Sequence, residues 1–165
     1  MAYETSAPRE SLVGLPPLLQ HDTEILILGS FPSSISLSER QYYANSRNQF
    51  WKILGAVTGS PLHQMDYDQR WPLLLATGIG LWDVYASCER EGSLDSDIRM
   101  GVPNDFASLA TRAPKLKRVC FNGQTAGKFQ RLFWDMGYTV LVLPSTSPAY
   151  TLAFERKLAA WRAAL

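Results

Sequence analysis

The chain has 165 residues and a hydrophobic share of 46%, which is ordinary for a globular protein with one buried core. Its net charge of +1 excludes a polycation, and no apolar run approaches the ~20 residues of a membrane-spanning helix. The first residues lack the basic-then-apolar order of a signal peptide. We therefore expect a cytoplasmic protein with a single domain over residues 1–165, of which residues 1–10 are flexible.

The chain contains few residues that bind metals or form disulfides. Cys88 and Cys120 are far apart in the sequence, and His21 and His63 are the two histidines. This set lacks the spacing of a four-ligand zinc or iron–sulfur site and is too small for a disulfide framework. We expect two reduced, buried thiols and no structural metal.

The first half of the chain predicts one strand among helices. Residues 12–20, broken by two prolines, predict a short helix before a strand over residues 24–28. Apolar residues on one face predict a helix over 48–58, and a second helix is expected over 68–76 with Pro72 in or near its first turn.

The second half continues the alternation of strands and helices. The expected elements are an apolar segment over 78–85 with a polar loop over 87–96, a helix over 106–110 capped by Asn104 or Asp105, a strand over 116–121, a helix over 125–136, a fully buried strand over 139–143 and an amphipathic helix over about 149–164. The tryptophans expected in the core are Trp51, Trp82, Trp134 and Trp161. This alternation predicts an α/β fold, a three-layer α/β/α sandwich with a parallel sheet.

Polar loops follow three of the predicted strands, at residues 29–33, 121–124 and 143–148. The carboxyl ends of parallel strands meet at one edge of a sheet, so these loops are expected to converge on a ligand site. A serine nucleophile at Ser30 or Ser33 needs a histidine base, and no histidine follows residue 63. Glycine-rich dinucleotide and phosphate loops are absent from the sequence. A pocket of hydroxyls, amides and aromatic rings suits a base flipped out of DNA.

Two stretches of this region resemble the first motif region of the uracil-DNA glycosylase superfamily. They read Gly-Ser-Phe-Pro-Ser at 29–33 and Tyr-Tyr-Ala-Asn-Ser-Arg-Asn-Gln-Phe-Trp at 42–51, and the likeness is strongest to the hypoxanthine (deoxyinosine) DNA glycosylase branch. Supporting stretches lie at 80–84, 88–95, 119–123 and 143–148. Together they span about residues 24–150.

The resemblance implies a central four-stranded parallel sheet and a monofunctional DNA glycosylase that uses neither metal nor cofactor. Such an enzyme hydrolyses the N-glycosidic bond of a deaminated base, hypoxanthine by preference, and leaves an abasic site for base excision repair. Its partner would be double- or single-stranded DNA containing that base, and the protein would be a monomer without membrane association. Two alternatives stay open: the same fold acting on uracil or xanthine in mismatches, and a non-catalytic nucleotide- or DNA-binding module.

Two residues depart from the superfamily pattern. Ser30 stands where better-known members have Asp or Asn to position the water, and Leu143 stands where some have a histidine that stabilises the leaving base. The resemblance implies that Asn48 and Asn122 are the catalytic residues instead. Asn48 can alternatively cap the helix that begins at the next residue, and Asn122 can serve the turn before a glycine.

The remaining site residues fall into two groups. Those expected to contact the substrate are Gly29, Ser30, Phe31, Pro32, Ser33, Tyr43 and Asn45. Phe31 and Tyr43 are candidates for stacking on the base, with core packing as the alternative, and Asn45 can also be an ordinary loop residue. Those expected to contact DNA, as a minor-groove wedge, are Pro144, Ser145, Thr146, Ser147 and Pro148.

Overall fold

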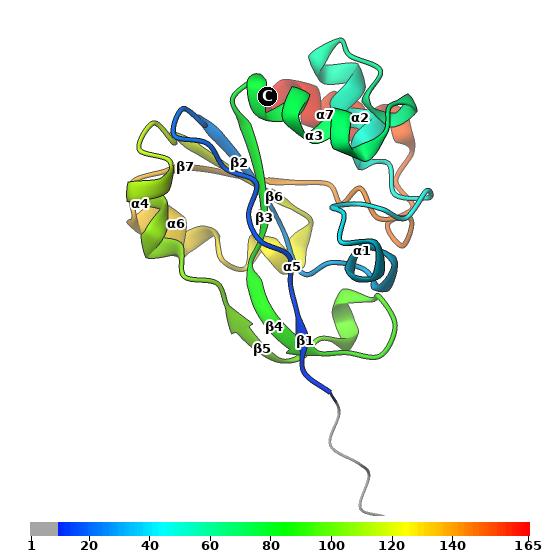
Figure 1. Ribbon diagram of the computed structural model, residues 1–165, viewed down its shortest axis with the longest axis vertical. Helices are drawn as coiled ribbons and strands as arrows, with labels where there is room; N and C mark the ends of the chain where they lie inside the picture. The colour runs from blue at the N-terminus through cyan, green and yellow to red at the C-terminus, as the bar shows by residue number, and fades with distance from the viewer. Residues whose placement is uncertain (1–9) are drawn as a thin grey trace, which may run out of the picture.

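The computed structural model describes residues 10–165 (Figure 1). The flexibility expected for residues 1–10 concerns a segment of which residues 1–9 lie outside the described part. Within residues 10–165, no helix combines the length and apolar character needed to span a bilayer.

A four-stranded parallel sheet forms the centre of the structure, as predicted. Its strands, in spatial order, are β3 (Ile79–Asp83), β2 (Ile25–Gly29), β6 (Arg118–Asn122) and β7 (Thr139–Leu143). The first three strands of this order, β3, β2 and β6, are short apolar runs that bury nearly every residue, as expected for parallel strands covered on both faces. The α/β/α fold class is confirmed.

Helices cover both faces of this sheet, and alternate residues of β2 define the two layers. Ile27 packs on the side of α2 (Phe50–Thr58), α3 (Tyr67–Ala76) and α7 (Phe154–Ala164), which lie together in Figure 1. Leu26 and Leu28 pack on the opposite side. The elements of that side are η3 (Phe106–Ser108), α4 (Leu109–Arg112), α5 (Gln124–Gly127) and α6 (Gln130–Asp135). The other short helices are α1 (Ser34–Glu39), η1 (Leu62–Gln64) and η2 (Asp95–Asp97).

Register places the strand ends of the central sheet side by side. Gly29 of β2 lies opposite Asp83 of β3, and Asn122 of β6 lies opposite Leu143 of β7. Polar groups that are distant in sequence therefore meet at one edge of the sheet.

A second, antiparallel sheet was not predicted. It contains β1 (Leu12–Val13), β4 (Tyr85–Glu89) and β5 (Arg99–Pro103) in the order β1-β4-β5. The helix predicted over 12–20 is wrong, because this segment is extended and pairs with distant strands. Two prolines remove helical donors here, while Gly14 N donates to Ala86 O at 2.8 Å.

Several other predicted elements are corrected by the structure. The helix predicted over 125–136 is divided into α5 and α6, and α7 begins at Phe154 rather than near 149. Pro72 lies in the second turn of α3. It has no N–H to donate to the carbonyl of Asp68, four residues earlier, and water can reach that carbonyl because both residues are exposed. Strand β7, at one edge of the sheet, alternates between exposed and partly buried residues before the buried Leu143, so the fully buried strand predicted over 139–143 is wrong. Asp105, not Asn104, caps the turn that follows it, since its Oδ1 accepts from Ala107 N at 3.2 Å.

The tryptophans divide between the core and the surface. Trp51, Trp82 and Trp161 are buried as predicted, whereas Trp134 is 62% exposed. The neighbouring Phe133 fills the core, so the next residue of α6 points outward. Trp161 is fully buried and its Nε1 donates to the carbonyl of Pro144 at 2.9 Å.

Two matched substitutions test this difference. Trp161→Phe removes a donor from a buried carbonyl and leaves a small cavity, so we expect the free energy of unfolding to fall by about 1–3 kcal/mol. Trp134→Phe makes the same change at an exposed site and is expected to shift it by no more than about 0.5 kcal/mol. Urea denaturation measures both values, and equal losses would contradict the assignment of the two side chains.

Candidate active site

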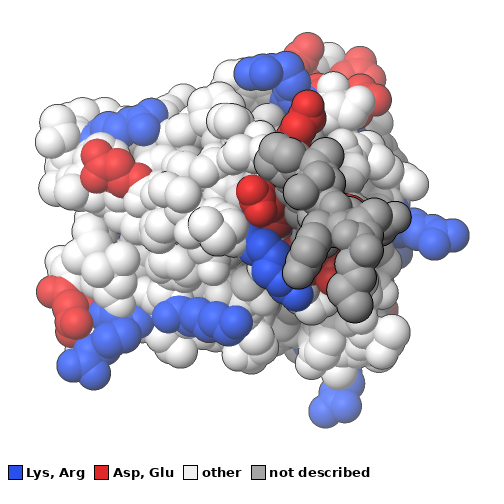
Figure 2. All heavy atoms as spheres, turned by 90° about the horizontal axis from the view of Figure 1, so that it is seen from below, with Lys and Arg blue, Asp and Glu red and all other residues white. Residues whose placement is uncertain are grey.

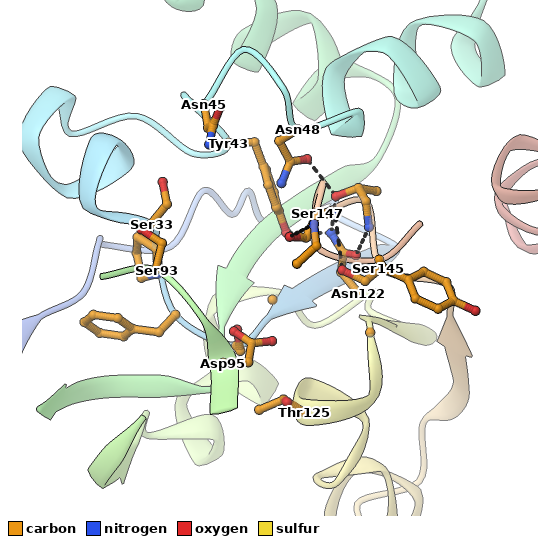
Figure 3. Close-up of a pocket in the computed structure, with 18 of the residues that line it drawn as sticks. Ser33, Tyr43, Asn45, Asn48, Ser93, Asp95, Asn122, Thr125, Ser145 and Ser147 are labelled. Atoms are coloured by element: carbon orange, nitrogen blue, oxygen red, sulfur yellow. Dashed lines mark hydrogen bonds between the residues drawn. The ribbon is translucent and has the colours of Figure 1, made fainter. Parts of the chain in front are cut away.

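A cavity of about 450 Å³ opens at the carboxyl edge of the parallel sheet (Figure 3). It is bounded by the loops after β2, β4, β6 and β7, by the end of β3 and by the segment that leads into α2. Every residue that the sequence predicted for the site lines this cavity, from Gly29 to Ser33, at 43, 45, 48 and 122, and from Pro144 to Pro148. The convergence of the three polar loops is therefore confirmed.

The hydroxyl of Thr146 joins the two asparagines across the cavity wall. Thr146 Oγ1 donates to Asn48 Oδ1 at 2.8 Å and accepts from Asn122 Nδ2 at 3.0 Å. Two backbone donors fix how the amides are turned, because Thr146 N donates to Asn122 Oδ1 at 2.9 Å and Phe50 N donates to Asn48 Oδ1 at 3.0 Å. Because a backbone N–H can donate only to an acceptor, these two hydrogen bonds identify which atom of each side-chain amide is the oxygen.

Asn48 combines the two roles left open by the sequence. Its oxygen accepts from Phe50 N at the start of α2 and from Thr146, so it organises the helix entry. Its Nδ2 makes no hydrogen bond within the described residues, and Figure 3 shows this amino group turned away from Thr146, on the cavity side. Asn48 therefore offers the cavity donors, while its acceptor is already engaged.

Asn122 lies buried at the centre of the wall. It is 8% exposed, and besides its contacts with Thr146 it donates to the hydroxyl of Tyr43 at 3.2 Å. Gly123 follows at φ +97°, where a side chain would be strained, and its N–H donates to Leu143 O at 3.0 Å. The Asn122 side-chain amide thus links the hydroxyl of Tyr43 to Thr146 in the loop after β7.

Tyr43 projects its phenol into the cavity. The residue has φ +55°, and its ring stacks on Phe50 with centroids 3.9 Å apart and planes 17° apart. Burial, and next the negative charge of Asp83, raise the pKa of this phenol far above its ordinary value. Its oxygen accepts from Asn122, so the phenolic proton is available to a ligand.

Phe31 is packed rather than open for stacking on a base. It is 7% exposed, and the guanidinium of Arg90 lies 5.3 Å from its ring centroid. Arg90 also donates to the carbonyls of Pro32 and Gly92, which ties the loop after β4 to the turn after β2. Asn45 uses its own Oδ1 to accept from Arg47 N at 3.0 Å and so shapes the loop that carries it.

Two carboxyl groups that sequence reasoning missed also line the cavity. Asp83 ends β3 and is 5% exposed, with no hydrogen bond to its Oδ2 from the described residues. Burial, together with the charge of Asp95, raises its pKa to about 7, and Arg90 opposes this shift. A Cβ on Gly29 would lie 2.5 Å from Asp83 Oδ1, so the glycine leaves room for this carboxyl. A polar residue ending a short apolar run was the signal available in the sequence.

Asp95 comes from η2 and reaches the turn after β2. Its Oδ1 accepts from the hydroxyl of Ser30 at 2.6 Å. The two residues are 65 positions apart, and nothing local in the sequence indicates that they meet.

Hydrogen bonds from α7 anchor the loop after β7. Lys157 is 1% exposed and donates to the carbonyls of Tyr150 and Ser147 at 2.7 and 3.3 Å. Within the loop, Ser145 accepts from Ser147 N at 3.1 Å. Thr146 is fully buried, so its side chain supports the two asparagines in place of the DNA contact expected from the sequence.

Charged side chains form no single basic field on the face shown in Figure 2, where Lys and Arg are scattered among Asp and Glu. Two of the exposed cations are paired, Lys117 with Glu24 and Arg131 with Asp135, both at 3.0 Å. Between residues 10 and 165, no three His, Cys, Asp or Glu side chains are grouped as metal ligands would be.

The raised pKa of Asp83 predicts how stability changes with pH. Asp83 holds its proton more tightly in the folded protein than in the unfolded chain, so its ionisation destabilises the fold between pH 3.8 and about 7. Asp83→Asn removes this titration. Its free energy of unfolding relative to wild type should rise between pH 5 and pH 8 by at least about 1.4 kcal/mol, the equivalent of one pKa unit.

Urea denaturation at the two pH values measures this difference. Asp97→Asn, at an exposed carboxyl of η2, is the matched control, and its difference from wild type should stay nearly constant. A constant difference for Asp83→Asn as well would contradict the raised pKa.

Comparisons with known proteins identify the family of the chain. The sequence matches the uracil DNA glycosylase superfamily over residues 16–165. A hypoxanthine DNA glycosylase of Methanosarcina acetivorans is 43% identical over 150 residues, covering 91% of this chain and 95% of the relative. A protein of the same name from Methanosarcina barkeri is 38% identical over 148 residues, covering 90% and 94%.

A solved structure shares the fold. The solution NMR structure of a candidate uracil DNA glycosylase from Methanosarcina acetivorans has 42% sequence identity and a TM-score of 0.86, covering 93% of this chain and 96% of that one. Motifs, fold and relatives agree, and the superfamily predicted from the sequence is confirmed. The chain belongs to the uracil DNA glycosylase superfamily.

Proposed function

We propose that the protein is a monofunctional DNA glycosylase that removes hypoxanthine from deoxyinosine in DNA. The observation that carries this proposal is the pair of free donors in the cavity, Asn48 Nδ2 and the Tyr43 hydroxyl. The names of the two Methanosarcina relatives support the same substrate.

Neutral donors suit a deaminated base. Hypoxanthine presents the acceptors O6 and N7 and the donor N1–H, whereas adenine has an amino group in place of O6. A donor facing O6 forms a hydrogen bond, but the same donor facing the adenine amino group is left unpaired, at a cost of about 1–3 kcal/mol when buried. Asn48 and Tyr43 therefore favour keto bases over adenine.

The same donors serve the chemistry. As the N-glycosidic bond breaks, its electron pair moves onto the base and the sugar gains oxocarbenium character. Donors that are already oriented stabilise the departing base without reorganising. Asn48 is held by Phe50 and Thr146, and Tyr43 is held by Asn122, so both donors are fixed before substrate binds.

The loop at residues 144–148 suits the DNA side of the site. The loop lines the cavity, and its exposed and half-buried residues can reach a duplex. Lys157 and Trp161 hold the loop in place through hydrogen bonds to its backbone and to Tyr150 O. Wedging such a loop into DNA costs a few kcal/mol of unstacking, and a mispaired base lowers that cost. We infer that Ser145 and Ser147 contact phosphate as this loop enters the minor groove.

An excision assay tests the substrate. Labelled duplexes containing hypoxanthine, uracil or xanthine are incubated with excess protein and then treated with alkali, which cleaves abasic sites. We expect the fastest release from the hypoxanthine duplex. Product from the uracil or xanthine duplex alone would show that the substrate is another deaminated base. If no duplex gave product, the protein would be a non-catalytic binding module.

Substitutions at Asn48 test its donor. Asn48→Ala should lower the single-turnover rate at least about tenfold, equivalent to ~1.4 kcal/mol of transition-state stabilisation. Asn48→Asp keeps an oxygen for Phe50 N and Thr146 but replaces the amino group with a negative oxygen, so we expect at least the same loss.

Asn45→Ala is the matched control, because that amide lines the same cavity but serves its own loop. It should lose less activity than Asn48→Ala. A wild-type rate in folded Asn48→Asp would show that the residue only organises the helix entry.

A further inference from the structure

We propose that Asp95, held by Ser30, is the catalytic carboxylate that orients the attacking water and faces the positive charge developing on the sugar. This inference rests on the proposed glycosylase function and assigns a further residue to it.

The turn after β2 fixes the first member of the pair. Gly29 O accepts from Val84 N at 2.8 Å, and Ser30 O accepts from Tyr85 N at 3.2 Å, so the backbone there is tied to the junction between β3 and β4. The Ser30 side chain, in a residue 8% exposed, donates to Asp95 at 2.6 Å. This bond uses one carboxylate oxygen and leaves Oδ2 for a water.

The loop that carries Asp95 is fastened to the start of α1. Ser34 N donates to Ser93 Oγ at 3.0 Å, and Ser34 Oγ donates to Gly92 O at 3.1 Å. Arg90, itself 6% exposed, adds its hydrogen bonds to Pro32 O and Gly92 O. These contacts hold a carboxylate from a distant loop beside the cavity, where Figure 3 shows it opposite Asn48 and Asn122.

The other acceptors of the cavity are less suited to a water. The oxygens of Asn48 and Asn122 accept from Phe50, Thr146 or both. Asp83 is buried below the wall, where its repulsion with Asp95 favours its own protonated form. Asp95 is thus the acceptor that is both negatively charged and exposed to the cavity, with Arg90 and Asp83 as its charged neighbours.

The step balances as a hydrolysis. The C1′–N9 bond breaks with its electron pair passing to hypoxanthine, and the water oxygen forms a bond to C1′. One water proton passes to the Asp95 carboxylate and then to solvent, while the base takes up a proton from solvent. The products are the abasic sugar and neutral hypoxanthine. The fixed negative charge also stabilises the oxocarbenium-like transition state.

Single-turnover kinetics test this role. Asp95→Asn keeps an oxygen for the Ser30 hydroxyl but removes the charge and the proton acceptor, so we expect at least about a hundredfold loss, the lower end for a positioned base. Ser30→Ala should lose less, and combining it with Asp95→Asn should add little. Asp97→Asn, the same change two residues away, should keep the wild-type rate.

Binding of two duplexes that lack the target base distinguishes an electrostatic role of Asp95 from a purely structural one. One contains a pyrrolidine abasic analogue, whose cationic nitrogen mimics the charged sugar, and the other a neutral tetrahydrofuran site. Wild type and Asp97→Asn should prefer the cationic duplex, and Asp95→Asn should reduce that preference at least tenfold while binding the neutral duplex unchanged.

Two results would overturn the inference: a wild-type rate in Asp95→Asn, or equal losses of affinity for both duplexes. Because neither duplex carries a base, this comparison decides the role of Asp95 even if wild type fails to release hypoxanthine. That failure would count against the proposed substrate alone.

Discussion

The arrangement of the site depends on one buried hydroxyl. Thr146 Oγ1 accepts from Asn122 and donates to Asn48, so a single group satisfies polar atoms from β6 and from the entry of α2. Without it, two amides in the cavity wall would compete for other partners, and unpaired buried polar groups are costly. The loop after β7 thus links both halves of the wall, and Trp161 and Lys157 hold that loop against α7. The packing of α7 is in this way coupled to the orientation of the Asn48 and Asn122 side chains.

The cavity divides chemically into a neutral side and an acidic side. Asn48, Tyr43 and Asn122 form the neutral side, where the free groups are donors. Asp83 and Asp95 form the acidic side, near the ends of β2 and β3. A breaking N-glycosidic bond separates charge in the same sense, with the negative charge on the base and the positive charge on the sugar. Two fixed environments of opposite preference therefore match a transition state better than either could alone.

Local sequence patterns predicted the parts of the fold that depend on local signals. The strand at 25–29 and the turn after it combine an apolar run with Gly, Ser and Pro, and parallel topology then implies one shared edge. The antiparallel sheet was missed because its pairs, such as Leu12 with Cys88, join segments with no pattern of their own. Thr146 was grouped with its exposed neighbours for a related reason. A hydroxyl in a Ser/Thr/Pro loop has the same sequence signature whether it faces solvent or the core.

The serine at position 30 illustrates how a family pattern can depart at one residue while the pocket keeps its chemistry. A hydroxyl alone is a weak orienter of water, because it is neutral and its proton can point elsewhere. Because Asp95 accepts a hydrogen bond from the Ser30 hydroxyl at 2.6 Å, the hydroxyl is fixed, and a negative charge lies beside the end of β2. This carboxylate belongs to a loop anchored by Arg90 and Ser93 rather than to β2 itself. Reactivity at this edge is accordingly tied to the stability of that loop, which a carboxylate on β2 would not require.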